Sequence, residues 1–101
     1  MYYLGLDVGS SSVKAAIVDA KSGKSILGVH EPKNEMGINS LNNDWAEQDP
    51  NMWWKYTCDA IKRVCKESNV DSKKIGSIGI SYQMHGLVVV DKNGSPLRDS
   101  I

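Results

Sequence analysis

A long amphipathic segment, residues 49–68, lies between two groups of strand-like segments. Asp49 has the side chain of a typical N-cap, and Pro50 suits the first helical position. Apolar side chains then recur at helical spacing on two adjacent stripes, Trp54, Cys58, Ile61 and Cys65 on one and Trp53, Thr57, Ala60 and Val64 on the other. The pattern predicts a helix whose broad apolar face covers a sheet, with both tryptophans in the core. A strand that follows such a crossover is expected to run parallel to an earlier strand.

Short segments rich in β-branched and small residues lie on both sides of this helix. The predicted strands are residues 2–7, 13–19, 25–29, 74–81 and 87–91, with turns at Ser22-Gly23 and Asn93-Gly94. Residues 30–49 have no clear period and predict a long loop. We therefore expect an α/β fold with an antiparallel three-strand meander, one crossover helix, a fourth parallel strand beside the first, and a terminal hairpin. This order is typical of the start of the ribonuclease-H-like mixed sheet of actin-like ATPases, here incomplete.

The composition favours a small cytoplasmic domain that binds neither nucleic acid nor membrane. The chain has 101 residues, and 12 basic residues balance 12 acidic ones, so no strong field attracts an anionic partner. No apolar run reaches the roughly 18–20 residues of a membrane span, and no basic leader precedes an apolar run at the start. Cys58 and Cys65 would lie about 10 Å apart on one helix, too far for a disulfide. Reduced cysteines favour the cytoplasm.

The segment "DVGSSSVK" places a carboxylate, a glycine and three hydroxyls between the first two predicted strands. Gly9 allows close approach of a ligand, and successive backbone N–H groups in a tight turn form an anion-binding concavity. Ser10, Ser11 and Ser12 add hydroxyl donors, Lys14 supplies a positive charge, and Asp7 can hold Mg²⁺ directly or through water. The alternative is an ordinary hairpin in which Asp7 and the serines satisfy the turn. The stretch by itself favours neither, and it lacks the Gly-Lys-Ser/Thr of a Walker loop.

Two further polar motifs flank the helix and end the fourth predicted strand. Gln83, Met84, His85 and Gly86 follow that strand, and their polar and thioether groups suit a polyhydroxylated ligand. The alternative is a structural histidine. In "WAEQDP", helix capping explains Asp49 and Pro50 but not Trp45, Glu47 or Gln48. Because parallel strands present their carboxyl ends at one edge, we expect Asp7 and residues 83–86 to lie together.

These three motifs, in this order, resemble those of the FGGY carbohydrate kinases, and the run from Trp45 to Trp54 with Gln-Met-His-Gly is most similar to the xylulokinase branch. The resemblance covers essentially the whole chain. It implies an ATP-dependent pentulose kinase that phosphorylates the 5-hydroxyl of D-xylulose to give D-xylulose 5-phosphate. By resemblance, Asp7, Gly9–Ser12 and Lys14 bind the transferred phosphate of ATP, Asp7 holds Mg²⁺, and Gln83–Gly86 bind the sugar.

Other functions remain open beside this one. A gluconate-type FGGY kinase shares part of the last motif, and an actin or heat-shock type ATPase shares the first. A non-catalytic interaction module could keep the fold without the chemistry. A sugar-dependent thermal shift separates the kinases from the other two classes.

The resemblance also implies that residues 1–101 form only the N-terminal part of the kinase N-terminal domain, without the second domain. Members of the family are several times longer, and their general-base aspartate is expected beyond Ile101. We therefore expect no catalytic residue in this chain and no kinase activity from it alone. One helix cannot cover both faces of a mixed sheet, so we also expect the chain to form a homodimer or a larger assembly.

Overall fold

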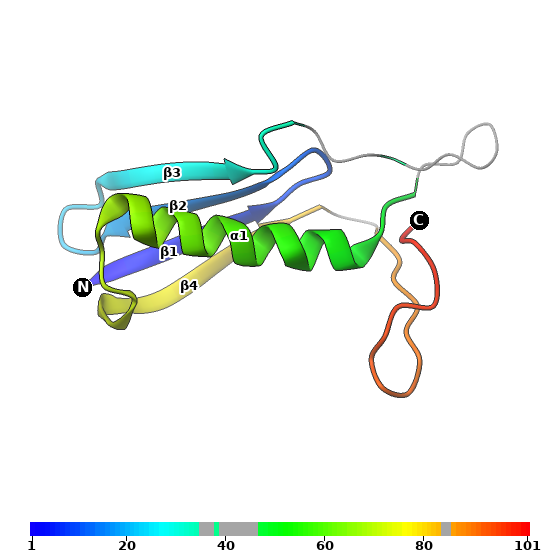
Figure 1. Ribbon diagram of the computed structural model, residues 1–101. Helices are drawn as coiled ribbons and strands as arrows, with labels where there is room; N and C mark the ends of the chain where they lie inside the picture. Colours follow the sequence, from blue (N-terminus) through cyan, green and yellow to red (C-terminus); the bar gives the residue numbers. More distant parts are fainter. Residues whose placement is uncertain (35–37, 39–46, 84–85) are drawn as a thin grey trace.

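The computed structural model describes residues 1–34, 38, 47–83 and 86–101, and within them it shows a mixed four-stranded sheet with one long helix on one face (Figure 1). The elements in chain order are β1 (Tyr2–Val8), β2 (Val13–Asp19), β3 (Ser25–Glu31), α1 (Pro50–Ser68), the short 3-10 helix η1 (Ser72–Lys74) and β4 (Ile75–Tyr82). The strand order is β3-β2-β1-β4. β2 is antiparallel to β1 and β3, whereas β4 is parallel to β1. The predicted meander, crossover helix and fourth parallel strand are confirmed.

The predicted start of α1 is confirmed by its cap. The Asp49 side chain accepts a hydrogen bond from the Asn51 N–H at 3.0 Å, and Pro50 is the first helical residue. At the other end, Asn69 adopts a left-handed conformation, with φ at 59°, and its N–H donates to the Lys66 carbonyl. A short side chain that tolerates this conformation is a common way to end a helix. Local sequence signals therefore define both ends of α1.

The hydrophobic core lies between α1 and one face of the sheet. Its buried side chains come from alternate positions of the first three strands and from one stripe of α1: Leu4, Leu6, Val13, Ala15, Ile17, Val29, Ala60 and Val64. α1 packs chiefly on β2 and β3, with a smaller contact with β1. The expectation that both tryptophans belong to the core is wrong, because Trp54 is 70% exposed and Trp53 is only partly buried, outside the core cluster. The stripe of Thr57, Ala60 and Val64 is enough to cover these strands, which leaves Trp54 at the margin of the contact.

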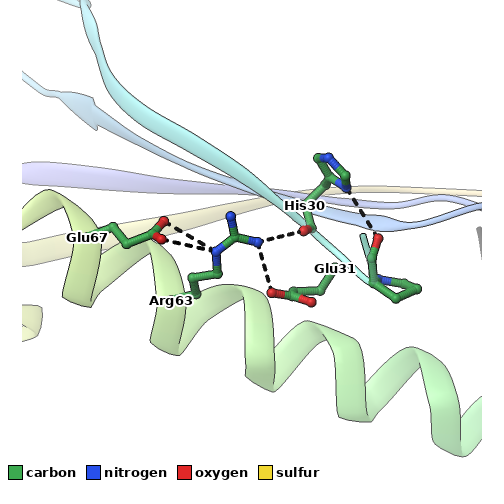
Figure 2. Close-up of polar contacts among 5 residues, drawn as sticks. His30, Glu31, Arg63 and Glu67 are labelled. Carbon is green, nitrogen blue, oxygen red and sulfur yellow. Dashed lines mark hydrogen bonds and ion pairs between the residues drawn. The ribbon is translucent and has the colours of Figure 1, made fainter. Parts of the chain in front are cut away.

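Arg63 connects the middle of α1 to the end of β3 through hydrogen bonds and an ion pair (Figure 2). Its guanidinium donates to the Glu31 carboxylate at 2.9 Å and to the His30 carbonyl at 3.1 Å. It also pairs with Glu67, one turn further along α1, at 3.3 Å. The two carboxylates hold the pKa of Arg63 above its ordinary value, Glu31 more than Glu67. These contacts fix α1 over the side of the sheet that is far from β4.

The predicted fifth strand, residues 87–91, does not join the sheet. Within the described residues it pairs instead with residues 95–101, through the bridge between Val90 and Pro96 and backbone hydrogen bonds that include Leu97 N–H to the Val89 carbonyl at 2.9 Å. This terminal hairpin lies beyond the carboxyl end of β4 (Figure 1). The predicted turn does form, because the Asp91 N–H donates to the Ser95 carbonyl at 2.9 Å and Gly94 has a φ of 82°. A two-stranded hairpin without a third strand or a helix against it is marginally stable in water. The apolar side chains of residues 87–90 are accordingly exposed.

β4 is both an edge strand and largely uncovered. Ile78 and Ile80 are paired in register with Leu4 and Leu6, so they lie on the same face of the sheet as α1. Yet Ile78 is 56% exposed and Ile80 is 63% exposed, whereas Leu4 is 2% exposed. Because α1 sits over β2 and β3, this apolar surface has no cover among the described residues.

Both cysteines lie on α1 as free thiols, and each is partly buried. Across the described ranges of the chain, no helix combines the length and the apolar character needed to span a bilayer.

Candidate functional site

The carboxyl ends of β1 and β4 lie side by side at the end of the molecule that also holds the start of α1 and the C-terminal segment (Figure 1). Asp7 is in register with Ser81, and Val8 is in register with Tyr82. The Gln83 N–H then donates to the Val8 carbonyl at 3.1 Å and continues the pairing past the end of the strand. The first and second polar motifs therefore meet, as the sequence predicted.

Residues 9–12 form a tight hairpin between β1 and β2. The Gly9 N–H donates to the Ser12 carbonyl at 3.0 Å, which leaves Ser10 and Ser11 at the tip. A Cβ at Gly9 would lie 3.1 Å from the same carbonyl oxygen, so a larger residue would strain the turn. The backbone N–H groups of Ser10, Ser11 and Ser12 have no hydrogen-bond partner among the described residues. The loop is thus a tight hairpin closed by a backbone bond, and it keeps donors for an anion.

Asp7 and Lys14 are cross-strand partners on the sheet face opposite α1. Both side chains are exposed, and they line a shallow hollow of about 260 Å³ together with Gly5 and Ala16. Among the described residues no ion pair joins the two. The carboxylate and the ammonium group are therefore both free to contact a charged ligand in this hollow.

Gln48 connects the hairpin to α1 and to the C-terminal segment. Its side-chain amide donates to the Ser10 carbonyl at 2.6 Å, and its side-chain oxygen accepts from the Trp53 indole N–H at 3.1 Å. Its backbone exchanges two hydrogen bonds with Ser100, at 3.0 and 2.7 Å. The sequence alone did not predict a role for Gln48. The one indication was that helix capping explains Asp49 and Pro50 but not Gln48.

The neighbouring Glu47 is buried, and its carboxylate forms an ion pair with Arg98. This pair and the backbone bonds between Gln48 and Ser100 join residues 47–48 to the C-terminal segment. Gly86 lies beside the same segment, because a Cβ at this position would be 3.5 Å from the Ser100 hydroxyl. The second and third motifs therefore approach each other next to the hairpin.

Only part of the predicted sugar site lies within the described residues. Gln83 is partly buried, and its side-chain nitrogen has no hydrogen-bond partner among them. Gly86 is described and exposed. Met84, His85 and Trp45 lie outside the described residues. The unpartnered amide of Gln83 is a donor for a hydroxylated ligand near the hairpin.

The donor set near the hairpin fits magnesium held together with phosphate. Mg²⁺ keeps several waters and usually takes one or two protein carboxylates plus phosphate oxygens. Asp7 supplies one such carboxylate, and in the described portion no group of three or more metal-binding side chains occurs. The residues present therefore suit a hydrated, phosphate-bound ion.

Residues 2–101 match the model of the FGGY family of carbohydrate kinases, N-terminal domain. The chain belongs to this family of phosphotransferases. It is 40% identical over 98 residues to a xylulose kinase of Staphylococcus epidermidis, an alignment that covers 97% of this chain and 19% of the relative. The chain thus spans about a fifth of the length of the curated relatives it matches.

Solved structures share the fold. A xylulose kinase structure from Brucella ovis superposes with a TM-score of 0.89 at 34% identity, over 100% of this chain and 20% of that one. A gluconate kinase structure from Lactobacillus acidophilus gives a TM-score of 0.85 at 27% identity, over 99% of this chain and 19% of that one. The mixed sheet with α1 on one face is therefore the fold of the FGGY kinase N-terminal domain.

Proposed function

We propose that the complete protein is an ATP-dependent pentulose kinase that phosphorylates D-xylulose to D-xylulose 5-phosphate. The supporting observation is the meeting of two motifs at one edge of the sheet, where the Gln83 N–H donates to the Val8 carbonyl directly after Asp7. The relatives called xylulose kinases support the choice of sugar. Residues 1–101 are then the N-terminal part of the kinase N-terminal domain, in a cytoplasmic enzyme.

The roles follow from the chemistry of phosphoryl transfer, which depends mostly on positioning and on neutralising charge. The N–H groups and hydroxyls of Ser10, Ser11 and Ser12 hold phosphate oxygens beside Gly9, and Lys14 meets a phosphate as a point charge. Asp7 holds Mg²⁺, directly or through water. When bound, the ion neutralises charge on the transferring phosphate.

The sugar is expected at the end of β4. The unpartnered amide of Gln83 donates to a sugar hydroxyl, and Gly86 leaves room for the sugar ring or chain. Met84 and His85 complete the contact, with the thioether on a carbon face and the imidazole on a hydroxyl. The general base is expected from another part of the complete enzyme.

A gluconate kinase is the second candidate, because the structure from Lactobacillus acidophilus has the same fold at 27% identity. A complete kinase that carries these residues separates the two when ADP release is coupled to D-xylulose, D-gluconate and glycerol in turn. We expect the highest kcat/KM with D-xylulose. A higher kcat/KM with D-gluconate or glycerol would show that this compound, and not D-xylulose, is the substrate. If neither turnover nor binding of sugar or nucleotide is found, the chain is an interaction module.

A further inference from the structure

We propose that Gln48 is a positioning residue that orients the Ser10–Ser11 peptide, so that the Ser11 N–H faces the phosphate of the ligand. The inference rests on the proposed function, since it assigns a task within the same phosphate site. Gln48 lies in the motif before α1, 38 residues along the chain from Ser10. It forms hydrogen bonds with the Ser10 carbonyl, the Trp53 indole and the Ser100 backbone, and it acts through the hairpin backbone.

The geometry of a peptide unit links the direction of the Ser10 carbonyl to that of the Ser11 N–H. The Ser10 carbonyl and the Ser11 N–H belong to one planar trans peptide, in which the two groups point in opposite directions. Gln48 holds the Ser10 carbonyl with a short hydrogen bond of 2.6 Å. The Ser11 N–H is therefore directed away from Gln48.

Gln48 and the charged pair Asp7 and Lys14 lie on opposite sides of the sheet. Gln48 directly precedes the cap of α1 and is bonded to Trp53, so it approaches the hairpin from the α1 side. Asp7 and Lys14 lie on the opposite face. Directing the Ser11 N–H away from Gln48 thus directs it toward the side of the sheet that carries these two charged groups.

Loss of the bond from Gln48 would allow the Ser10–Ser11 peptide to turn over. The tip of a two-residue hairpin has few contacts of its own, and the alternative peptide orientation would present the Ser10 carbonyl oxygen to the anion. A carbonyl dipole in place of an N–H donor repels phosphate, so a flipped peptide removes a donor and adds a repulsion.

Gln48 is well suited to hold the peptide because its own position is fixed on several sides. Its side chain is nearly buried, at 8% residue exposure, and its oxygen accepts from the Trp53 indole. Its backbone pairs with Ser100 in both directions. A buried side chain with both amide groups bonded has little freedom, so it transfers this rigidity to the hairpin.

Two neutral substitutions separate the Ser10 bond from the Trp53 bond. Gln48→Met keeps the length of the side chain and removes both hydrogen bonds, whereas Trp53→Phe removes the indole donor and leaves the Ser10 bond. The readouts are the Ser11 amide signal in ¹H–¹⁵N NMR spectra of the 101-residue chain, its hydrogen exchange, and the apparent affinity for inorganic phosphate. The amides of the Ser22-Gly23 turn serve as an internal reference.

We expect Gln48→Met to shift the Ser11 signal without ligand, to speed its exchange, and to weaken phosphate binding about threefold to tenfold. Trp53→Phe is expected to leave phosphate affinity within about twofold of the original chain. If Trp53→Phe weakens phosphate binding as much as Gln48→Met does, the proposal is overturned, because Gln48 then acts through α1. An unchanged Ser11 signal and affinity in Gln48→Met overturns it as well.

A folding defect in Gln48→Met is recognised by lost dispersion of the β1 and β2 amides. Gln48→Glu then replaces it, because its carboxylate still accepts from Trp53 but cannot donate to Ser10. It must change the Ser11 signal in the absence of phosphate, and an unchanged signal overturns the proposal. If phosphate leaves the original hairpin unperturbed, the proposed function fails at this loop, whereas the ligand-free comparison still decides whether Gln48 sets the peptide plane.

Discussion

Arg63 donates to the Glu31 carboxylate at 2.9 Å and so joins the middle of α1 to the last residue of β3. The contact is partly shielded, since the two side chains are 33% and 20% exposed. The same guanidinium reaches the His30 carbonyl (Figure 2). β3 is an edge strand, so this arginine holds α1 over the margin of the sheet.

Arg63→Met is predicted to lower the free energy of unfolding of the chain modestly, because it keeps the apolar stem and removes a solvent-screened ion pair. Urea unfolding of the variant beside Lys62→Met measures the loss. Lys62 is exposed on the same helix and forms no ion pair within the described chain. An equal loss in both variants contradicts a specific role for the Arg63 contact.

The ionised Asp19 carboxylate is predicted to stabilise the fold, and this stabilisation is lost in acid. The Ser22 hydroxyl and then the Lys21 N–H hold the pKa of Asp19 below its ordinary value of 3.8 by bonding to the ionised carboxylate. Its contribution to stability is therefore present above the unfolded-state pKa and is lost as pH falls through the lower folded-state pKa. Ser22→Ala should move the pKa up toward 3.8 in a carboxyl-carbon NMR titration. Ser25→Ala, a control in β3, should not move it.

The helix and the first strands could be predicted because their signals are local. Asp49 and Pro50 mark the start of α1, and the residues of β2 alternate between a buried and an open face. The parallel pairing of β4 follows from the crossover alone. These features depend on periodicity and on capping, both of which can be read from neighbouring residues.

The features that the sequence did not predict depend on contacts between residues far apart in the chain. Trp54 repeats at helical spacing with Cys58, yet it is exposed because α1 is placed over β2 and β3. Residues 87–91 have the β propensity of a strand, but they pair only with residues 95–101 and do not extend the sheet. The bond from Gln48 to Ser10 spans 38 residues and joins a side chain to a backbone group, so no local pattern indicates it.

The ion pair of Glu47 and Arg98 is predicted to contribute more to the free energy of unfolding than the pair of Arg63 and Glu31. Glu47 is buried, so Arg98→Ala leaves a carboxylate without its charged partner and should lower the free energy of unfolding by about 1–3 kcal/mol. Glu47→Gln should cost less, because no buried charge remains. Urea unfolding compares both with Lys92→Ala in the exposed loop. A larger loss for Glu47→Gln than for Arg98→Ala contradicts this account.

The chain is predicted to self-associate through β4, with a symmetric dimer as the expected form. Ile80 is 63% exposed on an edge strand, and such an edge recruits another strand. Ile80→Lys should shift the population toward monomer in analytical ultracentrifugation at several concentrations. Ile26→Lys, an exposed position on the other edge strand, should not. A sharp monomer of the unmodified chain at high concentration, with cooperative thermal unfolding, contradicts the prediction.

The most direct test of the account is the effect of Asp7→Asn on kcat and on the KM for sugar in a complete kinase that carries these residues. Asp7 is assigned to Mg²⁺ and phosphate, whose charge matters most in the transition state, so kcat should fall about a hundredfold or more. The KM for D-xylulose should stay within about threefold, whereas His85→Ala should mainly raise that KM. If Asp7→Asn instead raises the KM and leaves kcat unchanged, the assignment of the phosphate site to the end of β1 is wrong.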